Sequence, residues 1–308
     1  MAPRLVFSVC WFLLLLLLSS VCGGRRLRGE STALTLESVR KFLTREEDSI
    51  VFSLIERAKY PRNAPAYDPS YLGSPAKFHG LSLVELFVRE TEAVQAKAGR
   101  YENPVEIPFF PRHMTSTLAP PYDFPNELHA AAAAVNVSGT IWREYLDGWL
   151  PQITSQGDDG NYAPTAAADL VCLQVRRSEV NCAYRKHEKR KLIRLRQALS
   201  RRIHYGRYVA EAKYRDAPQD YNTAIRAQDR DALMKLLTFE GQEDAVKRRV
   251  EEKAKVFGQD VTLGKRADGG GNATDYKVDP VVVYRLYGDW VIPMTKMVQV
   301  EYLLRRLD

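Results

Sequence analysis

Two segments of this chain place positively charged and hydrogen-bonding side chains inside strongly apolar sequence. The first contains Arg202 and Lys213, eleven residues or about three helical turns apart, and the second contains Thr295 and Gln299, four residues apart. A continuous helix therefore presents each pair on one face. A cation in apolar surroundings is costly unless an anion meets it. The pattern predicts a small dianion bound inside a helix bundle.

The elements that must position these residues have helical spacing almost throughout. Apolar residues recur at intervals near three, four and seven, which predicts helices over 35–60, 81–97, 141–153, 198–214, 229–237, 244–256 and 281–307. Proline-rich connectors are expected at 103–125 and 217–222, and a glycine-rich surface loop at 264–276. Alternating strand patterns are scarce. We therefore predict an all-α fold in a single domain.

Several common catalytic sets are missing from the sequence. It contains no glycine-rich phosphate loop, no GxSxG elbow and no HExxH motif, and Cys172 and Cys182 do not have the spacing of a zinc site. His204 is a lone imidazole, for which a structural hydrogen bond is the expected role. Arg40 on the first long helix and Glu243 near the start of another are, taken singly, typical of solvated or capping charges. Spacing alone does not assign them a function.

Five longer motifs resemble a known family. They are Leu34–Arg40, Glu47–Phe52, Gly157–Tyr162, Ala210–Lys213 and Val300–Leu307. Together they resemble the AroQ-type chorismate mutases of plants and fungi, and are most similar to the unregulated, cytosolic-type plant isoform. The resemblance covers Leu34–Asp308 and is interrupted at 175–197. It implies the all-α multi-helix bundle of the eukaryotic AroQ enzymes, a homodimer, chorismate as substrate, and no cofactor or metal.

The implied reaction is the pericyclic rearrangement of chorismate to prephenate in phenylalanine and tyrosine biosynthesis. It requires cations for two carboxylates and fixed donors at the breaking ether oxygen. The resemblance places Arg40 and Arg202 nearest the carboxylates and makes Lys213 a donor to the ether oxygen. It also implies that Glu243 accepts a hydrogen bond from the ring hydroxyl and that Thr295 assists a carboxylate.

Gln299 stands where eukaryotic members of this family usually carry glutamate. A glutamate donates a hydrogen bond to the ether oxygen only while it is protonated, whereas a glutamine amide donates at any pH. The substitution therefore predicts a pH–rate profile that is nearly flat through neutrality.

The effector side of the family pattern is also altered. Amino-acid-responsive members carry Gly-Ser after Asn-Tyr or Asn-Phe, whereas here Ala163 and Pro164 follow Asn161 and Tyr162. Close approach of a ligand to the backbone and a hydroxyl donor are thereby lost. Arg100 still matches an effector-side arginine, with Gly99 in place of its neighbour. We expect an enzyme that aromatic amino acids do not regulate.

The segment 175–197 accounts for the whole net positive charge of the chain. It contains nine of the 45 Lys and Arg residues and two of the 38 Asp and Glu residues, so 36 basic and 36 acidic residues balance elsewhere and the net charge of +7 is local. A nucleic-acid or acidic-surface arm and a solvated excursion without function are two interpretations. The boundary residues Val175 and Gln197 favour a third, a retained intron. The segment is expected to loop out beside Arg202.

The N-terminus is expected to be a secretory signal peptide. Arg4 precedes an apolar run from Leu5 to Leu18, which is shorter than the roughly 20 residues of a membrane span. Residues 1–24 are thus assigned to the signal, and 25–308 to the catalytic domain. The signal indicates the secretory pathway, and the alternative is the cytosol, where unregulated plant members reside. No membrane or nucleic-acid partner is expected. The rival function is a non-catalytic helical partner protein inactivated by the 175–197 segment.

Overall fold

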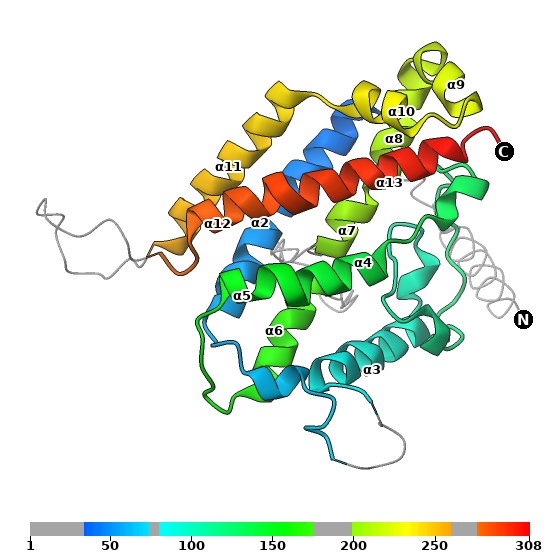
Figure 1. Ribbon diagram of the computed structural model, residues 1–308. Helices are drawn as coiled ribbons and strands as arrows, with labels where there is room; N and C mark the ends of the chain where they lie inside the picture. Colours follow the sequence, from blue (N-terminus) through cyan, green and yellow to red (C-terminus); the bar gives the residue numbers. More distant parts are fainter. Residues whose placement is uncertain (1–33, 74–79, 175–198, 260–275) are drawn as a thin grey trace, which may run out of the picture. The chain divides into compact units, whose positions relative to one another are not determined.

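Helices form the regular structure of the part of the chain that the computed structural model describes, residues 34–73, 80–174, 199–259 and 276–308 (Figure 1). No strand occurs among these residues, which confirms the predicted all-α class. The α-helices are α2 (Leu36–Ala58), α3 (Leu83–Lys97), α4 (Ser138–Arg143), α5 (Leu150–Ile153), α6 (Tyr162–Gln174), α7 (Leu199–His204), α8 (Gly206–Asp216), α9 (Pro218–Arg226), α10 (Arg230–Leu237), α11 (Glu240–Gly258), α12 (Pro280–Arg285) and α13 (Ile292–Leu304). Short 3₁₀ turns are η1 (Ala64–Tyr67), η3 (Arg100–Glu102), η4 (Pro111–His113) and η5 (Ala131–Ala134).

Two long helical stretches contain a π-helical turn followed by a proline. Glu144–Trp149 (η6) precedes Pro151, and Leu286–Val291 (η7) precedes Pro293. A proline inside a helix has no N–H to donate to the carbonyl of the preceding turn, and a wider π turn accommodates that break. Trp149 and Trp290, one from each turn, stack with ring centroids 6.1 Å apart. The predicted helices at 141–153 and 281–307 are therefore continuous but locally widened.

Helix α13 lies in apolar surroundings along most of its length. It contacts α7, α8, α9 and α10, and the preceding helix α12 runs beside α11 (Figure 1). Val298 and Leu303 are fully buried, and so is the polar pair Thr295 and Gln299, at 5% and 4% exposure. A buried polar side chain on such a helix must be satisfied by protein or by a ligand. This helix consequently brings hydrogen-bonding groups into the interior.

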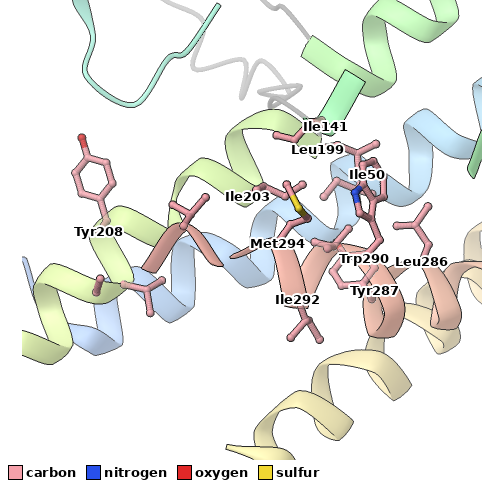
Figure 2. Close-up of a cluster of buried hydrophobic side chains, with 14 of the residues drawn as sticks. Ile50, Ile141, Leu199, Ile203, Tyr208, Leu286, Tyr287, Trp290, Ile292 and Met294 are labelled. Carbon is pink, nitrogen blue, oxygen red and sulfur yellow. The ribbon is translucent and has the colours of Figure 1, made fainter. Parts of the chain in front are cut away.

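One large apolar core joins the helices that carry the predicted site residues. Figure 2 shows Ile50 of α2, Ile203 of α7, and Tyr287 and Trp290 of the π turn meeting in this cluster, with Met294 of α13 beside them. All of these side chains are less than a tenth exposed. The core therefore fixes α2, α7 and α13 relative to one another.

One predicted connector is wrong. Residues 217–222 were expected to be irregular because of their proline, but α9 begins at Pro218 and continues to Arg226. Proline is well tolerated at the first position of a helix, where its missing N–H would have no partner in any case. Tyr221 and Ile225 then bury one face of the helix.

Some predictions fall on residues outside the described ranges. The signal peptide at 1–24, the segment 175–197 and nearly all of the loop predicted at 264–276 belong to this group. Residues Leu34–Asp308 form one compact unit. Among the described helices, none is both long and apolar enough to cross a bilayer.

The ends of α6 and α7 meet although 24 residues separate them in the sequence. Gln174, the last residue of α6, and Ser200, in the first turn of α7, line the same small surface pocket. Leu173 and Leu199, on either side of the gap, are both fully buried. The two helix ends are thus placed so that a much shorter connection could join them.

Deleting residues 175–197 should therefore stabilise the chain and raise its activity. A joined α6–α7 helix pairs backbone groups that two separate helix ends leave without intrahelical partners, and it does so next to Arg202. We expect a thermal midpoint raised by about 2 °C or more for each kcal/mol recovered, measured by circular dichroism, together with a higher kcat/KM. No gain in either quantity would show that the segment is tolerated or functional.

Candidate active site

A cavity of about 700 Å³, including its solvent-open mouth, lies among α2, α8, α11 and α13. Its lining is apolar on several sides, through residues such as Leu36, Val246 and Ile292. The structure brings all six predicted catalytic residues to this cavity, from five separate helices: Arg40, Arg202, Lys213, Glu243, Thr295 and Gln299. The structure therefore shows that these residues converge, and the role of each one stays a prediction.

Arg202 is the most deeply buried cation of the cavity, at 5% exposure. Its Nη1 donates to Thr295 Oγ1 at 3.1 Å, and Thr295 Oγ1 in turn donates to the Val291 carbonyl at 2.6 Å. The Nε of Arg202 has no hydrogen-bond partner among the described residues. Burial lowers the pKa of the guanidinium, which nonetheless remains charged at neutral pH. A charged group with a neutral partner and an unused donor is prepared for an anion.

Close packing of α8 on α13 makes the Arg202–Thr295 contact possible. A Cβ added to Gly206 would lie 2.6 Å from the Thr295 carbonyl oxygen and 3.1 Å from a methyl group of Val298. Real Cβ atoms do not approach backbone atoms that closely, so only glycine permits this helix crossing. This contact is the structural reason for a glycine at position 206.

An ionic cluster around the buried Glu47 lies near Arg202. Glu47, 1% exposed, accepts from Arg249 at 2.6 and 2.8 Å and from Lys253 at 2.9 Å. The fully buried Tyr287 and the negative charge of Glu47 both favour the charged form of Arg202. Sequence reasoning did not assign these residues a role, because their neighbours become visible only when α2, α11 and the π turn are brought together.

Lys213 lines the same cavity and lies against an aromatic ring. Its Nζ donates to the Leu237 carbonyl at 3.2 Å and sits 4.6 Å from the centre of the Phe239 ring. Burial, and then the positive charge of Arg40, lower the pKa of Lys213 to about 8, with a smaller contribution from Lys296; Glu243 acts in the opposite direction. The ammonium is therefore the group in this cavity whose charge changes near physiological pH.

Two residues that sequence reasoning missed hold the remaining predicted side chains. Arg40, exposed at the mouth, donates to Gln242 Oε1 at 3.2 Å. Glu243 is paired with Lys296, whose Nζ lies 3.1 Å from a carboxylate oxygen. Lys296 adjoins Thr295 in the sequence, and Gln242 adjoins Glu243. The sequence therefore gave one signal for both: each is a polar residue next to a predicted site residue.

Gln299 presents an amide to the cavity. Its Nε2 donates to the Thr295 carbonyl at 3.2 Å, and its Oε1 has no partner among the described residues. An amide nitrogen carries two hydrogens, so one donor remains for a ligand. The chain can thus surround a bound molecule with the cations of α7 and α8 and with the neutral donors of α13.

His204 has the structural role that was expected. Its Nε2 accepts from the Val137 N–H at 3.0 Å, and its Nδ1 lies 2.8 Å from the Ser200 carbonyl. Burial and the nearby Arg207 lower the pKa of His204 to about 3, so the ring is neutral and links α7 to the start of α4.

The predicted effector residues are not grouped in one place. Arg100 lies near Gln174 at the end of α6, whereas Asn161, Tyr162, Ala163 and Pro164 lie at its beginning. The twelve residue steps from Tyr162 to Gln174 span about 18 Å of helix. The Arg100 guanidinium is held by Glu106 at 3.1 Å and by Gln95. The hydroxyl of Tyr162 donates to Asp158 at 2.9 Å.

Comparison with known proteins identifies the family of the chain. No family model matches the chain. Chorismate mutase 2 of Arabidopsis thaliana is 51% identical over 91% of this chain and 96% of its own length. The chain belongs to the chorismate mutase family. The cytosolic chorismate mutase 2 of Zea mays is 50% identical over 89% of this chain and 97% of its own length. A chloroplastic chorismate mutase of Petunia hybrida is 46% identical, so similarity to the family extends to both isoform classes.

Solved chorismate mutase structures share the fold. The crystal structure of AtCM1 with tyrosine bound in its allosteric site has a TM-score of 0.73 and 45% identity, covering 91% of this chain and 99% of the other. Aro7p chorismate mutase from Candida albicans, in complex with L-Trp, has a TM-score of 0.75 and 32% identity, covering 89% of this chain and 92% of the other. The family resemblance predicted from the motifs is thereby confirmed.

The pH dependence of kcat/KM should separate the contributions of Gln299 and Lys213. Because the Gln299 amide does not titrate, we expect a flat profile from about pH 5 to 7. The rate should then fall through pH 8 as the Lys213 ammonium, with its pKa of about 8, loses its proton. Steady-state kinetics across this range test both points.

Two variants serve as controls for this profile. Lys213→Arg should remove the alkaline fall while lowering the rate, since a guanidinium stays charged. Gln299→Glu should add a decline with rising pH, because only a protonated carboxyl donates. A steep decline between about pH 5 and 7 in the unaltered chain would contradict the role given to Gln299.

Proposed function

We propose that this chain isomerises chorismate to prephenate within aromatic amino-acid biosynthesis. The observation that carries the proposal is the convergence of Arg40, Arg202, Lys213 and Gln299 on one cavity. Chorismate carries two carboxylates, and its rearrangement builds negative charge on the breaking ether oxygen. The cavity offers cations and fixed donors for both needs, and no protein nucleophile is required.

The proposed roles follow from the position of each side chain. Arg202, with its free Nε–H and Thr295 beside it, binds one carboxylate, and Arg40 at the mouth binds the other. Lys213 and Gln299 donate to the ether oxygen from α8 and α13. Glu243 accepts a hydrogen bond from the ring hydroxyl. These contacts select the compact conformer in which the bond-forming carbons meet.

Conversion of chorismate by the purified full chain tests this function directly. Arg202→Ala should lower kcat/KM by roughly 100- to 1,000-fold, as expected for removing one preorganised charge. Arg202→Lys should recover only part of the loss, because an ammonium cannot copy the guanidinium fork. Arg226→Ala, which removes an exposed arginine of α9, is the matched control and should leave the rate unchanged. A chain that leaves chorismate unconverted would refute the proposal and favour the non-catalytic partner protein.

The proposed enzyme is of the unregulated type. Ala163 and Pro164 offer no side-chain donor to an amino-acid effector, and the Arg100 charge is already met by Glu106. Tryptophan, tyrosine and phenylalanine at millimolar concentration should leave kcat/KM and the shape of the saturation curve unchanged. Activation by tryptophan of several-fold would show that an effector site survives despite the altered loop.

The compartment and the assembly are part of the same proposal. The apolar run at 5–18 supports delivery to the secretory pathway, with the cytosol as the alternative. A fluorescent fusion with and without residues 1–24 distinguishes the two destinations. We also propose a homodimer, which sedimentation of the purified chain would test.

A further inference from the structure

The cavity carries more positive charge than a dianion requires. Arg40, Arg202, Lys213 and Lys296 line it, against the single carboxylate of Glu243 among its described lining residues. In the proposed roles, the two carboxylates and the ether oxygen of chorismate use three of these four positive charges. The fourth is left without a substrate group to meet.

The partners of each cation identify which one it is. Three of them donate to neutral groups: Arg40 to the Gln242 amide, Arg202 to the Thr295 hydroxyl, and Lys213 to the Leu237 carbonyl. Lys296 alone among these four forms an ion pair with Glu243 in the described structure, with 3.1 Å between Nζ and the carboxylate. Its charge is therefore already neutralised by Glu243 in the wall of the cavity.

The Lys296 side chain is fixed both by its place on α13 and by the contacts of its ammonium group. It rises from α13 between the buried Thr295 and Gln299, and its ammonium also lies 3.3 Å from Thr238 Oγ1, in the connection between α10 and α11. Thr238 is itself fixed through a hydrogen bond of 2.8 Å to the Met234 carbonyl. The Lys296 side chain is 17% exposed. The ammonium therefore has one well-defined place, bridging α13 to the first turn of α11.

We propose that Lys296 is a positioning residue that fixes the Glu243 carboxylate for the ring hydroxyl of chorismate, an inference that rests on the proposed function. An ionised carboxylate has about four lone-pair directions, so the contact with Lys296 leaves capacity for a substrate hydroxyl. Without the ammonium, Glu243 is free to rotate toward solvent or toward Lys213. The hydroxyl would then meet a carboxylate that is present but misplaced.

This role differs from a stabilising salt bridge. Glu243 is 25% exposed, and partly exposed ion pairs contribute little to folding. A small misplacement of a substrate-binding group, by contrast, can cost up to about 100-fold in rate. Loss of the pair should consequently be visible in catalysis and nearly absent from thermal unfolding.

A double-mutant cycle tests the inference. Lys296→Met should lower kcat/KM by roughly tenfold or more in the unaltered chain. In a Glu243→Gln background the same change should cost less than about threefold, because the carboxylate on which Lys296 acts is gone. Equal losses in the two backgrounds would overturn the proposal, since Lys296 would then act on the substrate or on the fold independently of Glu243.

Two further variants control for charge and for folding. Lys296→Arg retains a cation that can reach Glu243 and should recover most of the rate. Lys255→Met removes a lysine of α11 that pairs with Glu251 and Glu252 outside the cavity, and should leave the rate unchanged. Thermal midpoints of all variants should agree within a few degrees. A large drop in the thermal midpoint of Lys296→Met that Lys296→Arg does not recover would assign the residue to folding and contradict the proposal.

The alkaline limb of the pH profile gives an independent readout. Lys213 is faced by Arg40 from α2, Glu243 from α11 and Lys296 from α13, and Lys296 is one of the charges that lower its pKa. Lys296→Met should therefore move the fall in kcat/KM to higher pH, whereas Lys296→Arg should not. An unmoved limb would place Lys296 away from the reacting groups. Failure of the unaltered chain to convert chorismate would instead refute the proposed function itself.

Discussion

Burial of Arg202 with a neutral hydroxyl, rather than a carboxylate, as its hydrogen-bond partner is the constraint on which the site depends. The side chain is 5% exposed, its cavity-side partner is the neutral Thr295 hydroxyl, and its Nε lacks a partner among the described residues. Such an arrangement costs free energy in the absence of ligand, and the surrounding core must offset it. The same cost becomes useful when an anion enters, because the donors are already oriented and little reorganisation is needed.

The helix that supplies the neutral donors is adapted to this purpose. Thr295 and Gln299 are one turn apart on the largely apolar α13, and Thr295 also donates to the Val291 carbonyl at the π-helical turn. The π turn and Pro293 loosen the regular backbone pairing there, while Gly206 lets α8 approach α13 closely. Close helix packing, rather than a loop, thus sets the distance between the Arg202 guanidinium and the donors of α13.

The chemical residues could be chosen from the sequence, but their neighbours could not. Spacing placed Arg202 and Lys213 on one helical face, and the family motifs added Arg40 and Glu243 from distant helices. Lys296 and Gln242 were not predicted, because a polar residue beside a predicted site residue is ordinary in a helix and its partner is decided by tertiary packing. Helix α9 was missed for a different reason: a proline reads as a connector unless the buried face after it, Tyr221 and Ile225, is weighed against it.

The placement of Arg202 relies on packing more than on chain continuity. Helix α7 is short and follows a long interruption, yet Leu199 and Ile203 are fully buried and His204 links it to the start of α4. Lengthening a connection eightfold, from three residues to 24, adds only about 2 kcal/mol of loop-closure entropy. Splitting one helix into two adds a further cost, because helix ends in general have backbone groups without intrahelical partners. The end of α6 is also held in place by its side chains, since the Gln174 amide donates to Glu92 and accepts from Tyr101. An interrupted helix can therefore still deliver its arginine to the cavity, provided that its buried face remains in the core.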